Sequence, residues 1–144
     1  RTIVGEEIIK AMRNGDDTEE FIEDIYSIDI KFRMNLDCKV SQNGFRDNFL
    51  RDMIERHIPL LASKKLLFNV VSHNIEGNFI LKWKVLNQGP EAERRNNIRG
   101  QILDDDGYLT RNESTMFKGS HIVECYAIQN SVVVARSQID VPIR

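Results

Sequence analysis

The sequence has little cysteine, proline or tryptophan, with two, three and one of these among 144 residues. It also lacks an excess of charge of one sign, because 20 basic residues oppose 22 acidic ones and leave a formal net charge of −2. A balanced charge produces no overall field that would attract nucleic acid or an anionic membrane. We therefore expect no extended nucleic-acid surface, and any anionic ligand must be bound by a local cluster of basic residues.

Long apolar runs are absent as well. No stretch approaches the roughly 18 residues of a membrane-spanning helix, and the first residues lack the basic and then apolar order of a secretory signal. The sequence thus predicts a cytoplasmic protein without membrane contact. Cys38 and Cys125 lie at inward positions of predicted strands, which favours reduced thiols in a core over a disulfide. We expect neither a metal nor another cofactor.

The first 64 residues predict short helices and one long strand. Helices are expected in three segments with apolar residues at helical spacing, namely residues 6–14, 17–26 and 45–57. Residues 28–41 alternate apolar and polar side chains, which is typical of a strand with one buried face. We expect residues 1–64 to form a lead-in that packs on the domain formed by residues 65–144.

Residues 65–144 predict short strands separated by turns. Seven strands are expected, at residues 66–71, 79–86, 97–103, 113–117, 121–128, 131–135 and 138–143. Trp83 and Cys125 occupy inward positions on two of them, as do the tryptophan and cysteine that pack together in immunoglobulin-like domains. The expected fold class is α+β, with a mainly antiparallel, immunoglobulin-like β-sandwich preceded by short helices and one long strand.

Candidate catalytic groups are few. Asp104, Asp105 and Asp106 precede Gly107 between two predicted strands, and because the further ligands of a calcium loop are missing, a turn is the better interpretation. The three histidines show no metal-ligand spacing, and no serine or cysteine is paired locally with a histidine and a carboxylate. The sequence predicts a non-catalytic domain, and an enzyme whose residues converge only in the folded chain is a weaker alternative.

Arginines gather at one predicted loop. Arg94, Arg95 and Arg99 surround a strand start at which Gly100 allows close backbone approach. Guanidinium groups suit phosphate, and together with Arg136 these arginines would form an anion-binding rim. A solvated loop with surface ion pairs is the alternative.

The middle of the chain is also locally basic. Its basic residues are Lys31, Arg33, Arg46, Arg51, Arg56, Lys64 and Lys65. Acidic residues interleave with them, so a solvated surface is the simpler interpretation and a docking face for a partner domain is the alternative.

Four separated motifs occur in order along the chain. They are WKVLNQGPEA at residues 83–92, IRG at 98–100, FKGSHIVECY at 117–126 and VARS at 134–137. In this combination the sequence resembles the adenylyl/guanylyl and SMODS C-terminal sensor domain, and the residues before 65 are similar to the segment that precedes that sensor. The resemblance implies the C-terminal region of a bacterial nucleotidyltransferase of the cyclic-oligonucleotide type, from antiphage signalling operons, without its catalytic core.

The function that this resemblance implies is sensing. The chain would bind a nucleotide-like or phage-derived ligand and regulate an attached or partner nucleotidyltransferase domain. The expected ligand contacts are Asn87, Arg95, Arg99, His121 and Arg136. The arginines would be anion donors, while Asn87 and His121 would hydrogen-bond a base or sugar, although a core or rim position is the alternative for His121. A different class of function stays open, a protein-interaction or oligomerisation module that docks through a sheet edge or face.

Overall fold

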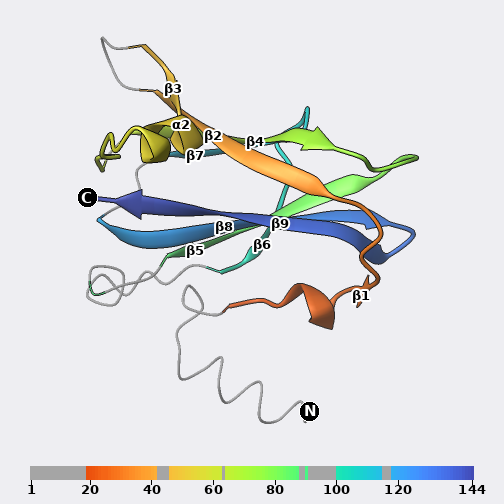
Figure 1. The fold of residues 1–144 in the computed structure, drawn as a ribbon. Coiled ribbons are helices and arrows are strands. Elements are labelled where there is room, and N and C mark those ends of the chain that lie inside the picture. Colours follow the sequence, from red (N-terminus) through yellow and green to blue (C-terminus); the bar gives the residue numbers. More distant parts are fainter. Residues whose placement is uncertain (1–18, 42–45, 63, 88–89, 91–99, 115–117) are drawn as a thin grey trace.

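The computed structural model describes residues 19–41, 46–62, 64–87, 90, 100–114 and 118–144. In these residues two β-sheets pack face to face (Figure 1). Sheet A contains, in spatial order, β1 (Ser27–Ile28), β9 (Val132–Ile143), β8 (Gly119–Gln129), β5 (Ile80–Asn87) and β6 (Ile102–Asp104). Sheet B contains β3 (Asn48–Phe49), β2 (Met34–Ser41), β4 (Lys65–His73) and β7 (Thr110–Ser114). The expected mainly antiparallel β-sandwich is confirmed.

The core lies between the two sheets, because each long strand buries alternate side chains. On β2 the buried side chains are Met34, Leu36, Cys38 and Val40. Cys38 and Cys125 are free, buried thiols, as expected. Trp83 and Cys125 are direct neighbours on β5 and β8, so they share one sheet and do not face each other across the sandwich. The immunoglobulin-like resemblance drawn from this pair therefore gains no support from their positions.

The long strand expected at residues 28–41 is wrong as a single element. Its first part is β1, which pairs in parallel with β9 of sheet A, and its second part is β2 of sheet B. Between them the chain follows β9, where the amides of Asp29 and Lys31 donate to the carbonyl oxygens of Val133 and Val134. A period of two is the same on either sheet, so the sequence pattern does not reveal where the chain crosses.

The last two predicted strands, 131–135 and 138–143, are one strand, β9. Arg136 and Ser137 continue its pairing with Tyr126 and Cys125 of β8, since polar residues can stand in a strand wherever one face is exposed. Other strand ends also differ. The strand expected at 97–103 is β6, and the one expected at 113–117 is β7; residues 97–99 and 115–117 lie outside the described residues.

The helical elements are shorter than expected. The helix expected at 45–57 is α2 (Leu50–Glu55), and the residues just before it form β3, which pairs with β2. The helix expected at 17–26 is reduced to the 3-10 turn η2 (Ile22–Asp24), while the one expected at 6–14 lies outside the described residues. Because β2 pairs with β4 along most of its length, the boundary expected after residue 64 runs through sheet B. None of the described helices is long and apolar enough to span a bilayer.

The acidic run forms the turn between β6 and β7, as expected. A carboxylate oxygen of Asp105 accepts a hydrogen bond from the Trp83 indole at 2.8 Å, and the other accepts one from the Gly107 amide at 3.0 Å. Asp106 accepts from the amide of Asn112 at 2.6 Å. These carboxylates are thus structural acceptors, and the described part of the chain holds no group of three or more metal-ligating side chains.

Candidate functional site

Several strands begin or finish together at one end of the sandwich, close to the C-terminus (Figure 1). At this end Ser41 pairs with Lys65, and Gly119 pairs with Ile143. Asn87 finishes β5 at the same end. We call this region the sandwich end. The chain leaves it after Asn87 into residues 91–99, so the predicted contacts Arg95 and Arg99 lie outside the described residues.

Two predicted contacts, Asn87 and His121, are brought together at the sandwich end. They are direct partners in the pairing of β5 with β8. Both side chains point between the sheets, where Asn87 is 4% and His121 is 0% exposed. Asparagine and histidine are seldom fully buried in apolar surroundings, because a buried polar group must be hydrogen-bonded. His121 therefore has the core position that was the alternative to a ligand contact. Together, Asn87 and His121 form a polar layer inside the sandwich end.

Arg136 lies elsewhere. It pairs with Tyr126, which is on the outer face of sheet A, because side chains along β8 alternate between the faces and His121 points inward. The guanidinium carbon of Arg136 is 5.5 Å from the centroid of the Tyr126 ring, a distance typical of a cation–π contact. The structure does not bring Arg136 together with Asn87 and His121.

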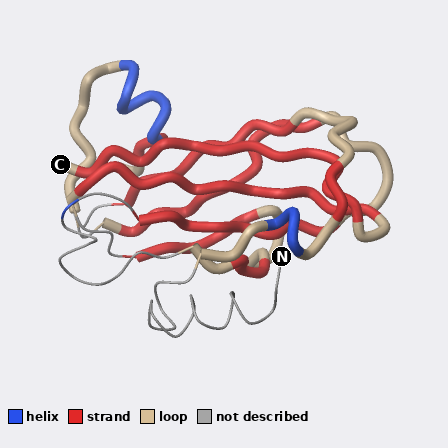
Figure 2. The backbone as a smooth tube through the Cα atoms, turned by 90° about the horizontal axis from the view of Figure 1, so that it is seen from below, coloured by secondary structure: helices blue, strands red, loops and turns tan. Residues whose placement is uncertain are grey.

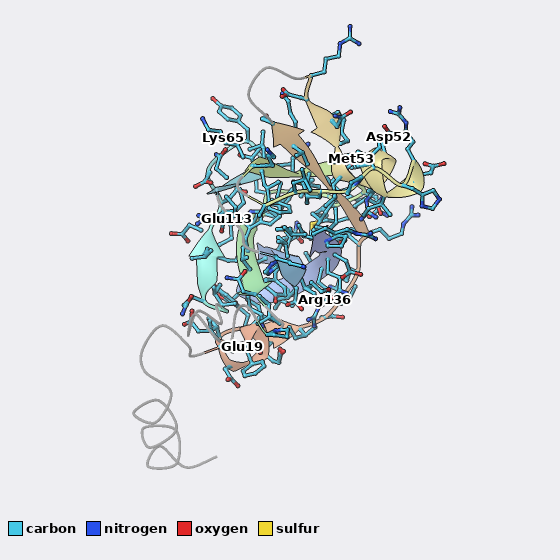
Figure 3. All side chains as sticks on the ribbon, turned by 90° about the vertical axis from the view of Figure 1, so that its left-hand side faces the viewer. Glu19, Asp52, Met53, Lys65, Glu113 and Arg136 are labelled. Atoms are coloured by element: carbon cyan, nitrogen blue, oxygen red, sulfur yellow. The ribbon has the colours of Figure 1, made fainter. Side chains whose placement is uncertain are left out.

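A shallow depression of about 350 Å³ opens on sheet B at the sandwich end. Its lining consists of Lys39, Ser41, Lys65, Leu66, Leu67, Asn112 and Glu113. The ammonium group of Lys39 is 3.4 Å from Asp47, and Lys65 lies on the sheet B side in Figure 3. The two lysines, the hydroxyl and the amide suit an anionic, hydrogen-bonding ligand. The carboxylate of Glu113, which also lines the depression, lies 3.8 Å from Arg111.

Sequence reasoning did not single out Lys39 or Asn112. The usable signal was the polar side of β2, on which Lys39 and Ser41 stand two residues apart and therefore share a face. The position of Asn112 opposite Leu67 depends on the pairing of β7 with β4, which the sequence does not specify.

A second hollow, of about 600 Å³, also lies near the sandwich end. It runs between α2 and the last residues of the chain, and its lining is Leu50, Ile54, His57, Ile58, Pro59, Leu60, Pro142 and Arg144. Ile54 stays 47% exposed beside it. We call this hollow the α2 groove, and its chemistry suits an apolar partner more than a nucleotide.

The outer face of sheet A is covered by residues 19–26, which we call the strap. Figure 2 views the sandwich from this side and shows η2 in front of the strands. Ile22 of the strap is 1% exposed and packs in a small second core with Tyr126, Ile128 and Val133. Burial, followed by the hydrogen bond to Glu124, raises the pKa of the Tyr126 phenol above its usual range. The strap is thus a packed layer of the fold.

Lys84 fixes the strap to sheet A. Its side chain is 6% exposed, and its ammonium nitrogen lies 3.4 Å from a carboxylate oxygen of Glu19 and 3.9 Å from one of Glu124. The same nitrogen donates to the carbonyl oxygen of Glu20 at 3.1 Å and lies 5.0 Å from the centroid of the Phe21 ring. A buried lysine is tolerated when it is paired and hydrogen-bonded in this way, so Lys84 acts as a structural cation.

The strap is also joined to the residues that follow the arginine loop. The amide of Glu20 donates to the carbonyl oxygen of Gly100 at 2.9 Å, and the amide of Ile102 donates to the Glu20 carboxylate at 2.7 Å. A Cβ atom at Gly100 would lie 2.8 Å from Cγ and 3.1 Å from Cα of Glu19. Gly100 therefore allows the close backbone approach that the sequence indicated, and the partner in that approach is the strap.

Comparison with known proteins supports the family resemblance that the four sequence motifs indicated. A family model described as "Adenylyl/Guanylyl and SMODS C-terminal sensor domain" matches residues 16–144. A cytidylate cyclase from Staphylococcus aureus is 31% identical over 99 residues, which cover 68% of this chain and 22% of that protein. The matched part thus spans about a fifth of the length of this relative.

Proposed function

Because the chain belongs to the adenylyl/guanylyl and SMODS C-terminal sensor domain family, we propose that it binds a small ligand and thereby regulates a nucleotide-forming catalytic domain of the same protein. The observation that carries the proposal is the family match, which extends over residues 16–144. The similarity to a cytidylate cyclase supports a cyclase or nucleotidyltransferase as the attached domain. The chain itself would have no catalytic role.

The ligand that we propose is nucleotide-like or phage-derived and carries at least one anionic group. The sandwich end suits such a ligand, because Lys39 and Lys65 line the depression on sheet B and the arginine loop follows β5. In this proposal Arg95 and Arg99 bind the anion. Asn87 and His121 are buried between the sheets at this end, so they would hydrogen-bond only the part of a ligand that enters between the sheets.

Regulation of the catalytic domain would pass through the strap. The strap precedes the sandwich in the chain and is hydrogen-bonded to Gly100 and Ile102, which directly follow the arginine loop. A ligand held by that loop would therefore act on residues that contact the strap. A role in antiphage signalling is part of the proposal, since sensing of a phage-derived ligand would give the regulated enzyme its trigger.

The proposal is tested by calorimetric titration of the chain with a panel of nucleoside triphosphates, cyclic mononucleotides and cyclic dinucleotides. Arg99→Ala should weaken binding by about tenfold or more, because a charge-assisted hydrogen bond contributes about 1.5–3 kcal/mol. Arg136→Ala, beside Tyr126 on the outer face of sheet A, is the control and should change binding little, because the structure does not bring Arg136 together with Asn87 and His121. If no member of the panel binds, or if Arg99→Ala binds as well as the unchanged chain, the proposal of a nucleotide sensor is wrong.

A second candidate function is a protein-interaction or oligomerisation module. The α2 groove favours it, because a mostly apolar hollow of about 600 Å³ next to an exposed Ile54 is typical of a docking site for an apolar side chain. Ile54→Asp should then abolish self-association in sedimentation or light-scattering measurements. A monomer at all concentrations, with unchanged mass in the variant, would rule out oligomerisation through this groove.

A further inference from the structure

The strap and the residues just after it expose an unusual amount of apolar side chain. Ten large hydrophobic residues are exposed in the described part of the chain, and four of them lie within residues 21–30. These four are Phe21, Ile25, Ile28 and Ile30, which are 45, 51, 38 and 48% exposed. Single exposed apolar residues are ordinary, whereas a group of them marks an interaction site.

The apolar surface continues onto sheet A beside the strap. Ile80, the first residue of β5, is 55% exposed. It lines a hollow of about 340 Å³ together with Tyr26 of the strap, Phe79 and Ile128. The strap and the start of β5 thus offer one uneven apolar region. We call it the lead-in surface and define it as Phe21, Ile25, Ile28, Ile30 and Ile80.

Acidic side chains border the lead-in surface. Glu23, Asp24 and Asp29 are all exposed and alternate in sequence with its apolar residues. The one basic residue in the same stretch, Lys31, lies 3.7 Å from Asp29. Interfaces combine an apolar centre with a polar rim of complementary charge. The partner that fits the strap part of this surface therefore presents apolar side chains with lysine or arginine beside them, whereas Lys82 and Arg136 add basic groups on the outer face of sheet A.

We infer that the lead-in surface is the face on which the catalytic domain of the same polypeptide docks. The inference rests on the proposed function, because it takes a catalytic domain to precede this sensor, which the family description calls C-terminal. In the cytidylate cyclase, most of the protein lies outside the part that matches this chain. The strap is the described segment nearest to the N-terminal side of the chain, and it enters on the outer face of sheet A (Figure 1). A preceding domain is therefore joined to the sandwich through the strap, and the α2 groove lies on the far side of the sandwich from the strap (Figure 1).

The strap would have two roles in this arrangement. Its inward side packs Ile22 against sheet A and holds Glu19 and Glu20 at Lys84. Its outward side, with Phe21 and Ile25, would contact the catalytic domain. A shift of the residues after the arginine loop would therefore reach the interface through the two hydrogen bonds of Glu20, without any further element.

The experiment compares this chain with the full-length protein that carries its catalytic domain, by hydroxyl-radical footprinting read out by mass spectrometry. Labelling of the five residues of the lead-in surface should fall severalfold in the full-length protein. Ile54 and Leu61 beside the α2 groove and Val71 on sheet B, which are 47, 49 and 50% exposed, are the matched controls and should be labelled equally in both. Equal labelling of the lead-in surface, or loss of labelling at Ile54 and Leu61 in its place, overturns the inference.

Substitutions in the full-length protein give a second readout. Ile25→Asp together with Ile28→Asp should restore labelling at Phe21 and Ile80, because charged groups cannot be buried against an apolar partner without a large cost. Val71→Asp, at a residue of matching exposure, should not restore labelling at Phe21 or Ile80. If Phe21 and Ile80 remain protected in the double variant, the docking face is elsewhere.

The failure of this inference is distinguishable from failure of the proposed function. If the lead-in surface is protected but no nucleotide in the panel binds, the interface is supported and the nucleotide sensor is ruled out. If a nucleotide binds and regulates the protein but the lead-in surface is labelled equally in both proteins, the sensor is supported and the interface is ruled out.

Discussion

Replacement of Lys84 by methionine tests whether a buried cation holds the strap on sheet A. Methionine keeps the length and most of the apolar packing of the lysine stem. It removes the hydrogen bond to the carbonyl oxygen of Glu20 and the charge that faces Glu19 and Glu124. The side chain of Lys84 is 6% exposed, so solvent does not replace these contacts unless the strap opens.

The expected cost follows from the exposure of each partner. A hydrogen bond from a charged donor contributes about 1.5–3 kcal/mol, and breaking a fully buried ion pair costs about 3–5 kcal/mol. Glu19 and Glu124 are 23 and 20% exposed, so water reaches them and reduces the penalty. Removal of a buried charge also returns part of the desolvation cost. We expect Lys84→Met to lower the free energy of unfolding by about 2 kcal/mol.

The assay is urea denaturation together with hydrogen exchange of the amides that join the strap to the sandwich. Exchange at the amides of Glu20 and Ile102 should accelerate in Lys84→Met, because each donates a hydrogen bond that joins the strap to residues 100–102. Lys82→Met is the matched control, since Lys82 stands on the same face of β5 but pairs with the exposed Asp104 and should matter little. If the Lys84→Met variant is as stable as the unchanged protein and its exchange is unchanged, Lys84 does not hold the strap on sheet A.

Three further predictions concern the packing around the strap and the core. Gly100→Ala should lower the free energy of unfolding by about 1–2 kcal/mol in urea denaturation, because the new methyl group would press on the backbone of Glu19; wild-type stability would contradict the close approach. Asp105→Ala should cost about 1–3 kcal/mol by loss of the acceptor for Trp83, whereas Asp105→Asn should retain most of the stability, and the fluorescence of this single tryptophan reports both; equal loss in the two variants would exclude the hydrogen bond as the cause. Stability should fall as the pH rises above about 9, because burial raises the pKa of several groups that the unfolded chain deprotonates first; urea midpoints that are equal at neutral and alkaline pH would contradict this. Those groups are Cys38, Cys125 and Tyr126.

The sandwich itself was predictable, because it depends on local patterns. The alternation of Leu36, Cys38 and Val40 with polar residues marks β2, and the turn residues between the later strands separate them. The pattern cannot say which sheet a strand joins, because both sheets bury alternate side chains. For that reason the crossing between β1 and β2 and the continuity of β9 at Arg136 were not predicted correctly.

The candidate site was predictable only in part. The sequence placed Asn87 just after one predicted strand and His121 at the start of another, and the pairing of β5 with β8 makes them direct partners. Grouping Arg136 with them required knowledge of which face of sheet A it occupies. The role of Lys84 was not predictable either, since it depends on contacts with Glu19 and Glu20, more than sixty residues earlier in the chain.

The proposal that the sandwich end binds the ligand is tested most directly by a chemical-shift titration of the isotopically labelled chain with ATP, GTP, CTP and their cyclic forms. We expect at least one of them to shift the amide resonances of Ser41, Lys65, Asn87 and His121, while amide resonances of the α2 groove, such as that of Ile54, stay unchanged. If no member of the panel shifts these amides, or if the shifts are confined to the α2 groove, the sandwich end is not the ligand site.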